Sequence, residues 1–210
     1  MLPTILTRQL AAVVLVGGLG QLASGCAKQP LPPAEYAAYL ADPAHGLSHT
    51  VEEKGTTITC VYRPTDQLVQ QELAASVLAA THARDSIART YTGKTYCTLT
   101  LSTPNGGFES QFVSTPAFYQ QVLTYLNTGI AADAFLATTS RDSVAALASM
   151  YVRQFGTTGH STILLVFDTH QLQPQQGFHV TLRGQRLGLG TLRFPFAAAD
   201  LAALPPLRFN

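Results

Sequence analysis

The chain has 210 residues, with 13 Lys and Arg, 12 Asp and Glu, and a formal net charge of +1. A chain this close to neutral has no electrostatic footprint for nucleic acid, and it lacks the strong acidity of an unstructured tail. Its length suits one domain with a substantial core and is short for two domains.

The first 25 residues have the three parts of a secretory signal peptide. Arg8 supplies a positive charge, residues 10–19 form an apolar run, and the small residues 23–25 stand directly before Cys26. A transmembrane helix needs about 20 predominantly apolar residues. The glycines and the glutamine within residues 17–21 make this run too short for one.

Residues 22–26 (Leu-Ala-Ser-Gly-Cys) resemble the lipobox of bacterial lipoproteins. The resemblance implies that signal peptidase II cleaves before Cys26 and that the sulfur of this cysteine carries a diacylglycerol. Such acylation holds a protein stably on a membrane. Ala27 stands where an Asp would favour the inner membrane, so we expect the outer membrane. The alternative is ordinary secretion with a free thiol at Cys26, which is unfavourable chemistry in an oxidising compartment.

Cleavage before Cys26 removes Arg8, and the 12 remaining Lys and Arg then equal the 12 Asp and Glu. Residues 26–34 contain three prolines, which favour an extended backbone, so we expect a lipidated cysteine followed by a semi-rigid tether. Residues 35–210 are expected to form a single globular domain. Beyond the lipobox, the chain resembles uncharacterised envelope lipoproteins of Gram-negative bacteria, a resemblance that implies processing and assigns no catalytic residue.

The first half of the domain alternates between helical and extended patterns. Residues 35–40 predict a short helix that ends before Pro43, and residues 65–89 predict an amphipathic helix. Residues 56–62 and 96–101 have the two-residue period of strands. The side chains expected on their buried faces are Ile58, Cys60, Tyr62, Cys97, Leu99 and Leu101.

The middle of the chain predicts a turn and two further helices. Residues 103–107 (Thr-Pro-Asn-Gly-Gly) are typical of a turn, which residues 108–113 would follow as the returning strand of a hairpin. Residues 115–126 begin with Thr-Pro and place Phe118, Val122, Leu123 and Leu126 inward. Residues 140–154 have apolar side chains at helical spacing, ended by Gly156. Residues 130–138 remain unassigned.

The last part predicts an apolar strand and a hairpin. Residues 162–167 are an unbroken apolar run, which we expect to be the most buried strand, covered on both faces and packed against the helix 140–154. Residues 178–182 and 192–196 alternate as a hairpin. The expected fold class is therefore α+β, a mostly antiparallel sheet with about three amphipathic helices packed on one side.

Two cysteines remain in the mature chain, Cys60 and Cys97, both in predicted strands. In an oxidising compartment they form a disulfide, or they are two small buried residues that never meet. The residues alone leave both open.

The histidines give no strong site. His45 and His49 are four apart, but Gly46 lies between them, so we expect a loop and no metal site. His160, His170 and His179 flank the apolar strand and either converge at one end of the sheet or lie apart in solvent. The last part of the chain is rich in arginine. Its hairpin either faces anionic groups or presents an ordinary solvent face. The four arginines are Arg183, Arg186, Arg193 and Arg208.

No constellation in the sequence requires catalysis or a cofactor. We therefore expect a lipid-anchored, non-catalytic binding or structural module, with the membrane as partner through Cys26 and an envelope protein or the cell wall as a further partner. The alternatives are an envelope hydrolase and a carrier of apolar ligands. A pocket that gathers several of His160, Asp168, His170 and His179 would favour the hydrolase, and an empty apolar cavity would favour the carrier.

Overall fold

The computed structural model describes residues 28–75, 81–140, 142–152 and 159–209. Within these ranges, nine strands form one antiparallel sheet in the order β1-β2-β3-β7-β6-β5-β8-β9, with β4 beside β3. The strands are β1 (Ser48–Glu53), β2 (Thr56–Arg63), β3 (Lys94–Thr103), β4 (Gly106–Gly107), β5 (Ala134–Thr138), β6 (Ser143–Val152), β7 (Ser161–Asp168), β8 (Phe178–Arg183) and β9 (Thr191–Phe196). The α-helices of the described residues are α1 (Pro33–Ala41), α2 (Thr65–Ala75), α3 (Thr81–Tyr91), α4 (Pro116–Thr124) and α5 (Ala198–Ala203).

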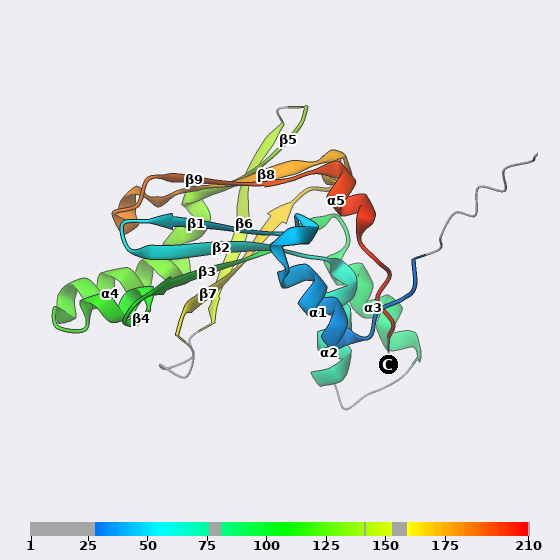
Figure 1. Cartoon of the computed structure of the whole chain (residues 1–210), viewed down its shortest axis with the longest axis horizontal. Coiled ribbons are helices and arrows are strands. Elements are labelled where there is room, and N and C mark those ends of the chain that lie inside the picture. Colours follow the sequence, from blue (N-terminus) through cyan, green and yellow to red (C-terminus); the bar gives the residue numbers. More distant parts are fainter. Residues whose placement is uncertain (1–27, 76–80, 141, 153–158, 210) are drawn as a thin grey trace, which may run out of the picture.

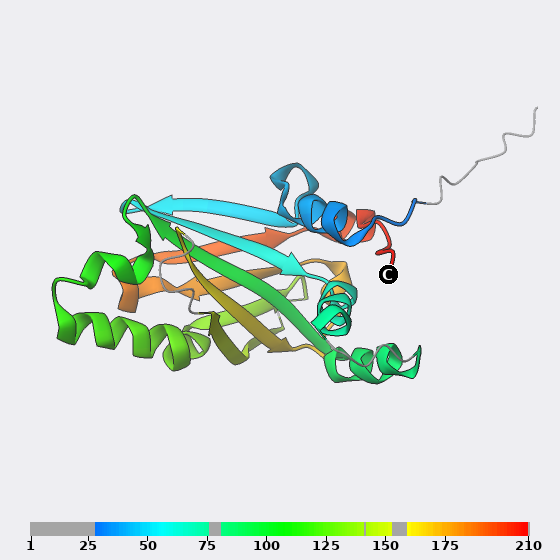
Figure 2. The same cartoon turned by 90° about the horizontal axis from the view of Figure 1, so that it is seen from below.

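The sheet curls into a nearly closed, barrel-like form (Figure 1). The helices lie at its two ends: α1, α2, α3 and α5 at one, called the α5 end here, and α4 at the other, called the α4 end (Figure 1 and Figure 2). The α+β class and the mostly antiparallel sheet are confirmed, but the expectation that helices pack on one side of the sheet is wrong. A sheet that curls on itself covers its own apolar face, so the helices are left to cover its ends.

The interior is filled by one set of alternating apolar side chains. Each strand with a two-residue period turns every second residue inward, as predicted for 56–62, 96–101 and the hairpin of β8 and β9. These residues form one continuous core. Its members from the longer strands include Ile58, Cys60, Cys97, Leu99, Leu101, Ile163, Leu165, Phe167, Val180, Leu182, Phe194 and Phe196.

The two ends of the strand order, β1 and β9, meet at a seam. Here the Glu53 carboxylate accepts a hydrogen bond from the Gly190 amide at 2.7 Å, and the Lys54 ammonium donates to the Gly188 carbonyl at 2.6 Å. Toward the α5 end, the His49 ring stands edge-on to Phe196, with centroids 5.0 Å apart. Side chains thus form hydrogen bonds with backbone groups at the seam and cover strand edges that would otherwise stay unpaired.

Residues 140–154 depart from the sequence prediction. The predicted helix is wrong: the described part forms β6, paired with β5 and β7. The register shifts at a bulge after Ala146. Val144 and Ala146 face the core before the bulge and Tyr151 faces it afterwards. Because the bulge adds one residue to a two-residue period, core contacts fall seven residues apart, from Val144 to Tyr151, which is also the spacing of a helix face.

Strand β7 is central in the sheet but buried on one face only. Ile163, Leu165 and Phe167 are fully buried, whereas Leu164 and Val166 are half-buried. The prediction of burial on both faces is therefore wrong. The sheet is covered on its inner side by its own far wall, and the outer surface of β7 continues into exposed apolar side chains of β6, namely Leu147, Met150 and Val152.

Short sequence motifs predicted some of the other elements correctly. The helix over 35–40 is confirmed as α1, and the turn at 103–107 is confirmed by the pairing of β3 with β4. The returning strand predicted over 108–113 is wrong: the strand that pairs with β3 is the two-residue β4, and a 3₁₀ turn occupies Phe108–Phe112. The unassigned segment 130–138 contains β5.

The predicted helices over 65–89 and 115–126 differ in outcome. Helices α2 and α3 occupy the described parts of the first range, and residues 76–80 between them lie outside the described residues, as does Gly156. Helix α4 begins at Pro116 as predicted and buries Val122 and Leu123, with Leu126 buried just beyond it. Phe118 is exposed instead of buried, with its ring edge-on to that of Phe112.

Candidate functional site

A cavity of about 530 Å³ opens to solvent at the α5 end. It lies where β2 ends, β3 begins, β7 ends and β8 begins, so its walls come from segments far apart in sequence. We call it the α5 cavity, and the lining residues that matter below are Tyr62, Lys94, His170, Phe178, Ala202 and Leu204.

Aromatic rings form the floor of the α5 cavity. The Tyr62 ring is edge-on to Phe178, with centroids 5.9 Å apart, and Phe178 stacks on Phe196 at 4.8 Å. Burial, followed by the nearby Cys97 and Asp66, raises the pKa of Tyr62 to about 12. The phenol is therefore neutral at physiological pH, and the floor offers apolar surface with one hydroxyl.

A tight turn after α3 shapes the rim. Gly93 has a φ of +74°, in the left-handed region that favours glycine, and a Cβ there would approach the Cβ of His170 to 3.1 Å. The Gly93 carbonyl accepts the Thr169 amide at 2.8 Å, which ties this turn to the end of β7. Lys94 follows, and its ammonium donates to the Thr90 carbonyl at 2.8 Å. Glycine at 93 thus lets the start of β3 and the end of β7 meet at the cavity.

Asp168 and His170 form a pair at the end of β7. The His170 Nδ1 and the Asp168 Oδ1 are 2.6 Å apart, and this hydrogen bond holds the pKa of Asp168 below its ordinary value. Both side chains are exposed. Within the described part of the chain, no hydroxyl or thiol hydrogen-bonds to the His170 ring, so the pair lacks the nucleophile of a hydrolytic triad.

The other histidines of the predicted set lie elsewhere. His160 precedes β7 and His170 follows it, so the eight residues of the strand separate them along the chain. His179 is on β8, where its Nδ1 is 3.0 Å from the Arg193 guanidinium. The structure therefore brings Asp168 and His170 together but does not gather the three histidines at one end of the sheet.

His45 and His49 also have separate partners. The His45 ring stacks on Tyr39 at 3.6 Å, whereas the His49 Nε2 is 3.1 Å from the Gly46 carbonyl. In the ranges that the structure describes, no three His, Cys, Asp or Glu side chains gather as metal ligands would.

The C-terminal arginines divide among different contacts. Arg183 lies over the Phe135 ring at 4.3 Å, and Arg186 is 3.5 Å from the Asp133 carboxylate. Arg193 contacts a histidine, and Arg208 belongs to the C-terminal segment. Arg183 and Arg193 share the outward face of β8 and β9, where they are diagonal neighbours, whereas Arg208 lies in the C-terminal segment.

Sequence reasoning missed a polar cluster at the α4 end. The Ser161 hydroxyl accepts the Phe108 amide at 2.8 Å and donates to the Glu109 carboxylate. Burial, and then a hydrogen bond to Glu109, raises the pKa of Tyr151. A Cβ on Gly107 would approach the Ser161 Oγ to 2.9 Å, so glycine permits this contact. The cluster joins the 3₁₀ turn to β6 and β7, and no local pattern connects residues so far apart in sequence.

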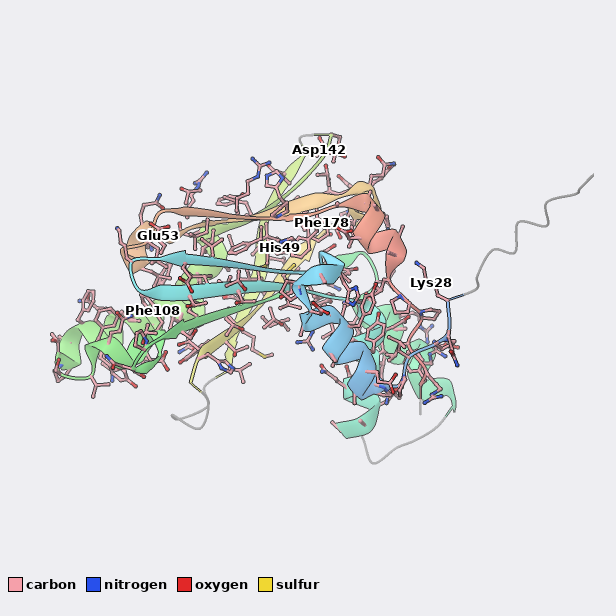
Figure 3. All side chains as sticks on the ribbon, in the orientation of Figure 1. Lys28, His49, Glu53, Phe108, Asp142 and Phe178 are labelled. Carbon is pink, nitrogen blue, oxygen red and sulfur yellow. The ribbon has the colours of Figure 1, made fainter. Side chains whose placement is uncertain are left out.

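The described chain enters the domain beside the α5 cavity. The Lys28 ammonium donates to the carbonyl of Ala202, which lines the cavity, and Leu31 pairs with Leu207 through backbone hydrogen bonds on both sides. Figure 3 shows Lys28 at the opposite end of the molecule from Glu53 and Phe108. Cys26 and Ala27 lie outside the described residues.

Comparison of the chain with protein-family models, with curated proteins and with solved structures finds no match. None of the helices within the described ranges has the length and apolar character needed to cross a bilayer.

Proposed function

We propose that this protein is a lipid-anchored envelope protein whose domain binds an envelope partner in the α5 cavity and catalyses no reaction there. The observation that carries the proposal is the entry of the chain at the cavity itself, where Lys28 bonds to Ala202. An anchor just upstream of Lys28 would hold this end of the domain toward the membrane.

The lipobox supplies the anchor in this proposal. Cys26 precedes Lys28 by two residues, which span at most about 7 Å of extended chain. Because Leu31 is already paired with Leu207, we place the end of the free tether at Pro30. A tether this short keeps the α5 cavity close to the bilayer surface, in the outer membrane if the cell has two membranes.

The chemistry of the cavity favours binding over catalysis. An aromatic floor with a few polar groups at the rim is typical of sites that hold a ligand in one orientation. Such a site fits a partner that presents an apolar group flanked by hydrogen-bonding groups. A carrier of apolar ligands is less well supported, since the interior of the sheet is filled by its own side chains and the cavity is open.

Two variants test the binding site. Ala202→Trp places a large ring on the cavity lining, and Ala203→Trp places the same ring on the adjacent exposed position of α5, which does not line the cavity. We expect cross-linked partners recovered from native membranes with the parent protein to be lost with Ala202→Trp and retained with Ala203→Trp. Equal recovery with both variants would contradict a site in the cavity.

Fractionation tests the anchor. Replacing Cys26 by Ala should move the protein out of the membrane fraction, because no acyl chain can then be attached. Undiminished membrane association of that variant would contradict lipidation at Cys26.

The pair of Asp168 and His170 keeps an envelope hydrolase as the second candidate, since an imidazole oriented by a carboxylate is a component of many hydrolytic sites. Purified protein should show no hydrolysis of cell-wall or ester substrates above that of His170→Ala. Activity that His170→Ala abolishes would replace the binding proposal by the hydrolase.

A further inference from the structure

We infer that a second cavity, at the α5 end of the outward face of β5, β8 and β9, binds a phosphate group through Arg193 and His179. The cavity has a volume of about 720 Å³ and opens to solvent. It is distinct from the α5 cavity, although Phe178 lines both. The inference uses neither the proposed anchor nor the proposed partner, so it is tested independently of the proposed function.

The strand register brings the two side chains to one place. His179 is opposite Pro195, so it is a diagonal neighbour of Arg193 on the outward face. At the end of the cavity nearest α5, Gly177 has a φ of +94°, and a Cβ there would approach the Ala198 amide nitrogen to 3.2 Å. Glycine at this position therefore lets the start of β8 meet the start of α5 at the cavity wall.

Arg193 and His179 contribute hydrogen-bond donors to the cavity lining. The Arg193 Nη2 is 3.0 Å from the His179 Nδ1. A guanidinium has no acceptor, so Nδ1 accepts this hydrogen bond and the proton of the neutral imidazole is on Nε2. The guanidinium keeps further N–H donors, and the ring keeps its Nε2–H donor. The pair therefore fits a ligand that supplies acceptors only.

The cavity also has a positive charge that no acidic side chain balances. Arg193 is always charged, and none of the described lining residues is Asp or Glu. Within the described ranges, no carboxylate forms an ion pair with Arg193. The Asp142 carboxylate, in the turn between β5 and β6, instead accepts the Ser140 hydroxyl at 2.6 Å. Arg183, diagonal to Arg193, adds a second positive charge to this face. The charge favours an anion.

The arrangement of donors favours phosphate over carboxylate. The fork of a guanidinium can bind both oxygens of a carboxylate, whereas a phosphate offers a third oxygen to the Nε2–H of His179. The hydroxyls of Thr139 and Ser143 also line the cavity and can donate to a phosphate. The ligand chemistry is thus a phosphate group, carried by a lipid headgroup or free in solution.

The titration of His179 reports on this site alone. Burial, and then the Arg193 charge, lowers the pKa of His179 in the free protein. A phosphate held by both side chains would favour the imidazolium, because a nearby opposite charge stabilises the charged form. Bound phosphate should therefore raise the pKa of His179, whereas phosphate bound elsewhere should leave it unchanged.

The first measurement is an NMR titration of the full chain in a neutral detergent, with inorganic phosphate as the probe and chloride at equal ionic strength as the reference. The His179 ring signal is identified by its loss in His179→Asn. We expect phosphate to raise the pKa of His179 and to bind more tightly than acetate. An unchanged pKa would overturn the inference, and tighter binding of acetate would overturn phosphate as the ligand.

Two variants test the role of Arg193 in the same titration. Arg193→Gln should bind phosphate at least about tenfold more weakly than the parent, because the charged fork is lost. Arg208→Gln removes the same charge from the C-terminal segment, away from the lining, and should bind like the parent. Unchanged signals of the other histidines show that each variant is folded. Equal affinity of the two variants would mean an adventitious ion only and would overturn the inference.

The second measurement distinguishes the two sources of phosphate. Full chain with Cys26→Ala, which has no site for an acyl chain, is mixed with vesicles of phosphatidylcholine alone or with added phosphatidic acid. Binding to phosphatidic acid that is lost in Arg193→Gln and kept in Arg208→Gln supports the site with a lipid headgroup as ligand. Binding of free phosphate without such vesicle binding supports the site with a soluble phosphate as ligand.

Discussion

The hydrogen bond between Glu53 and Gly190 is expected to hold the seam of the sheet closed. In Glu53→Ala the Gly190 amide loses its acceptor at 2.7 Å, at a part-buried position. A hydrogen bond to a charged group contributes about 1.5–3 kcal/mol, and partial access of water to the freed amide lowers the loss to about 2 kcal/mol. For a domain of this size we expect the melting temperature to fall by about 4–8 °C.

The assay is urea and thermal unfolding of Glu53→Ala beside two controls. Glu52→Ala removes the same charge from the exposed neighbouring residue of β1, and Glu53→Gln retains an acceptor oxygen for the Gly190 amide. We expect Glu52→Ala to unfold like the parent and Glu53→Gln to recover most of the loss. Hydrogen exchange of the Gly190 amide should also quicken in Glu53→Ala. If Glu53→Ala and Glu52→Ala unfold alike, the seam does not depend on this bond.

Three further predictions concern the core, the α4 end and the outer surface. Leu165→Asp buries an unpaired charge and should prevent folding, whereas Leu164→Asp on the half-buried face should still give folded protein in an unfolding titration. If both variants lose folded protein to the same extent, the conclusion that β7 is buried on one face only is wrong. Ser161→Ala leaves a buried amide without its acceptor, so its free energy of unfolding should fall by about 1–3 kcal/mol in urea. Burial, and then the Arg193 charge, lowers the pKa of His179, so protonation favours the unfolded chain and stability should decline as the pH falls below about 6.5. His179→Asn should flatten that decline when unfolding free energies are compared across pH, and an unchanged slope would contradict the role of this histidine.

The strands that were predicted correctly share one property. In β2, β3, β8 and β9 one face meets the core and the other meets solvent or a helix, so inward and outward residues differ in polarity along the chain. The predictions failed where residue polarity no longer alternates with the inward and outward positions of the strand. The bulge in β6 shifts the alternation after Ala146, and the outer face of β7 carries Leu164 and Val166 although it is only half-buried.

The candidate site illustrates the same limit. The sequence indicated Asp168 and the histidines as candidates, and the structure pairs Asp168 with His170 while it places His160 and His179 elsewhere. The aromatic floor of the α5 cavity was not predicted as a site. Tyr62 had the ordinary spacing of a core residue, and nothing near it in the chain indicates that Phe178 lies against it.

The sequence by itself determined the features that depend on neighbouring residues. These are the two-residue period of the regular strands, the turn before Gly107, the end of α1 before Pro43 and the start of α4 at Pro116, because polarity, turn chemistry and the fixed geometry of proline act over a few positions. Only the tertiary structure decided the closure of the sheet, the seam at Glu53, the cluster at Ser161 and the α5 cavity. Each of these joins segments far apart in the chain, and its contacts exist only once the strands have taken their order in the sheet.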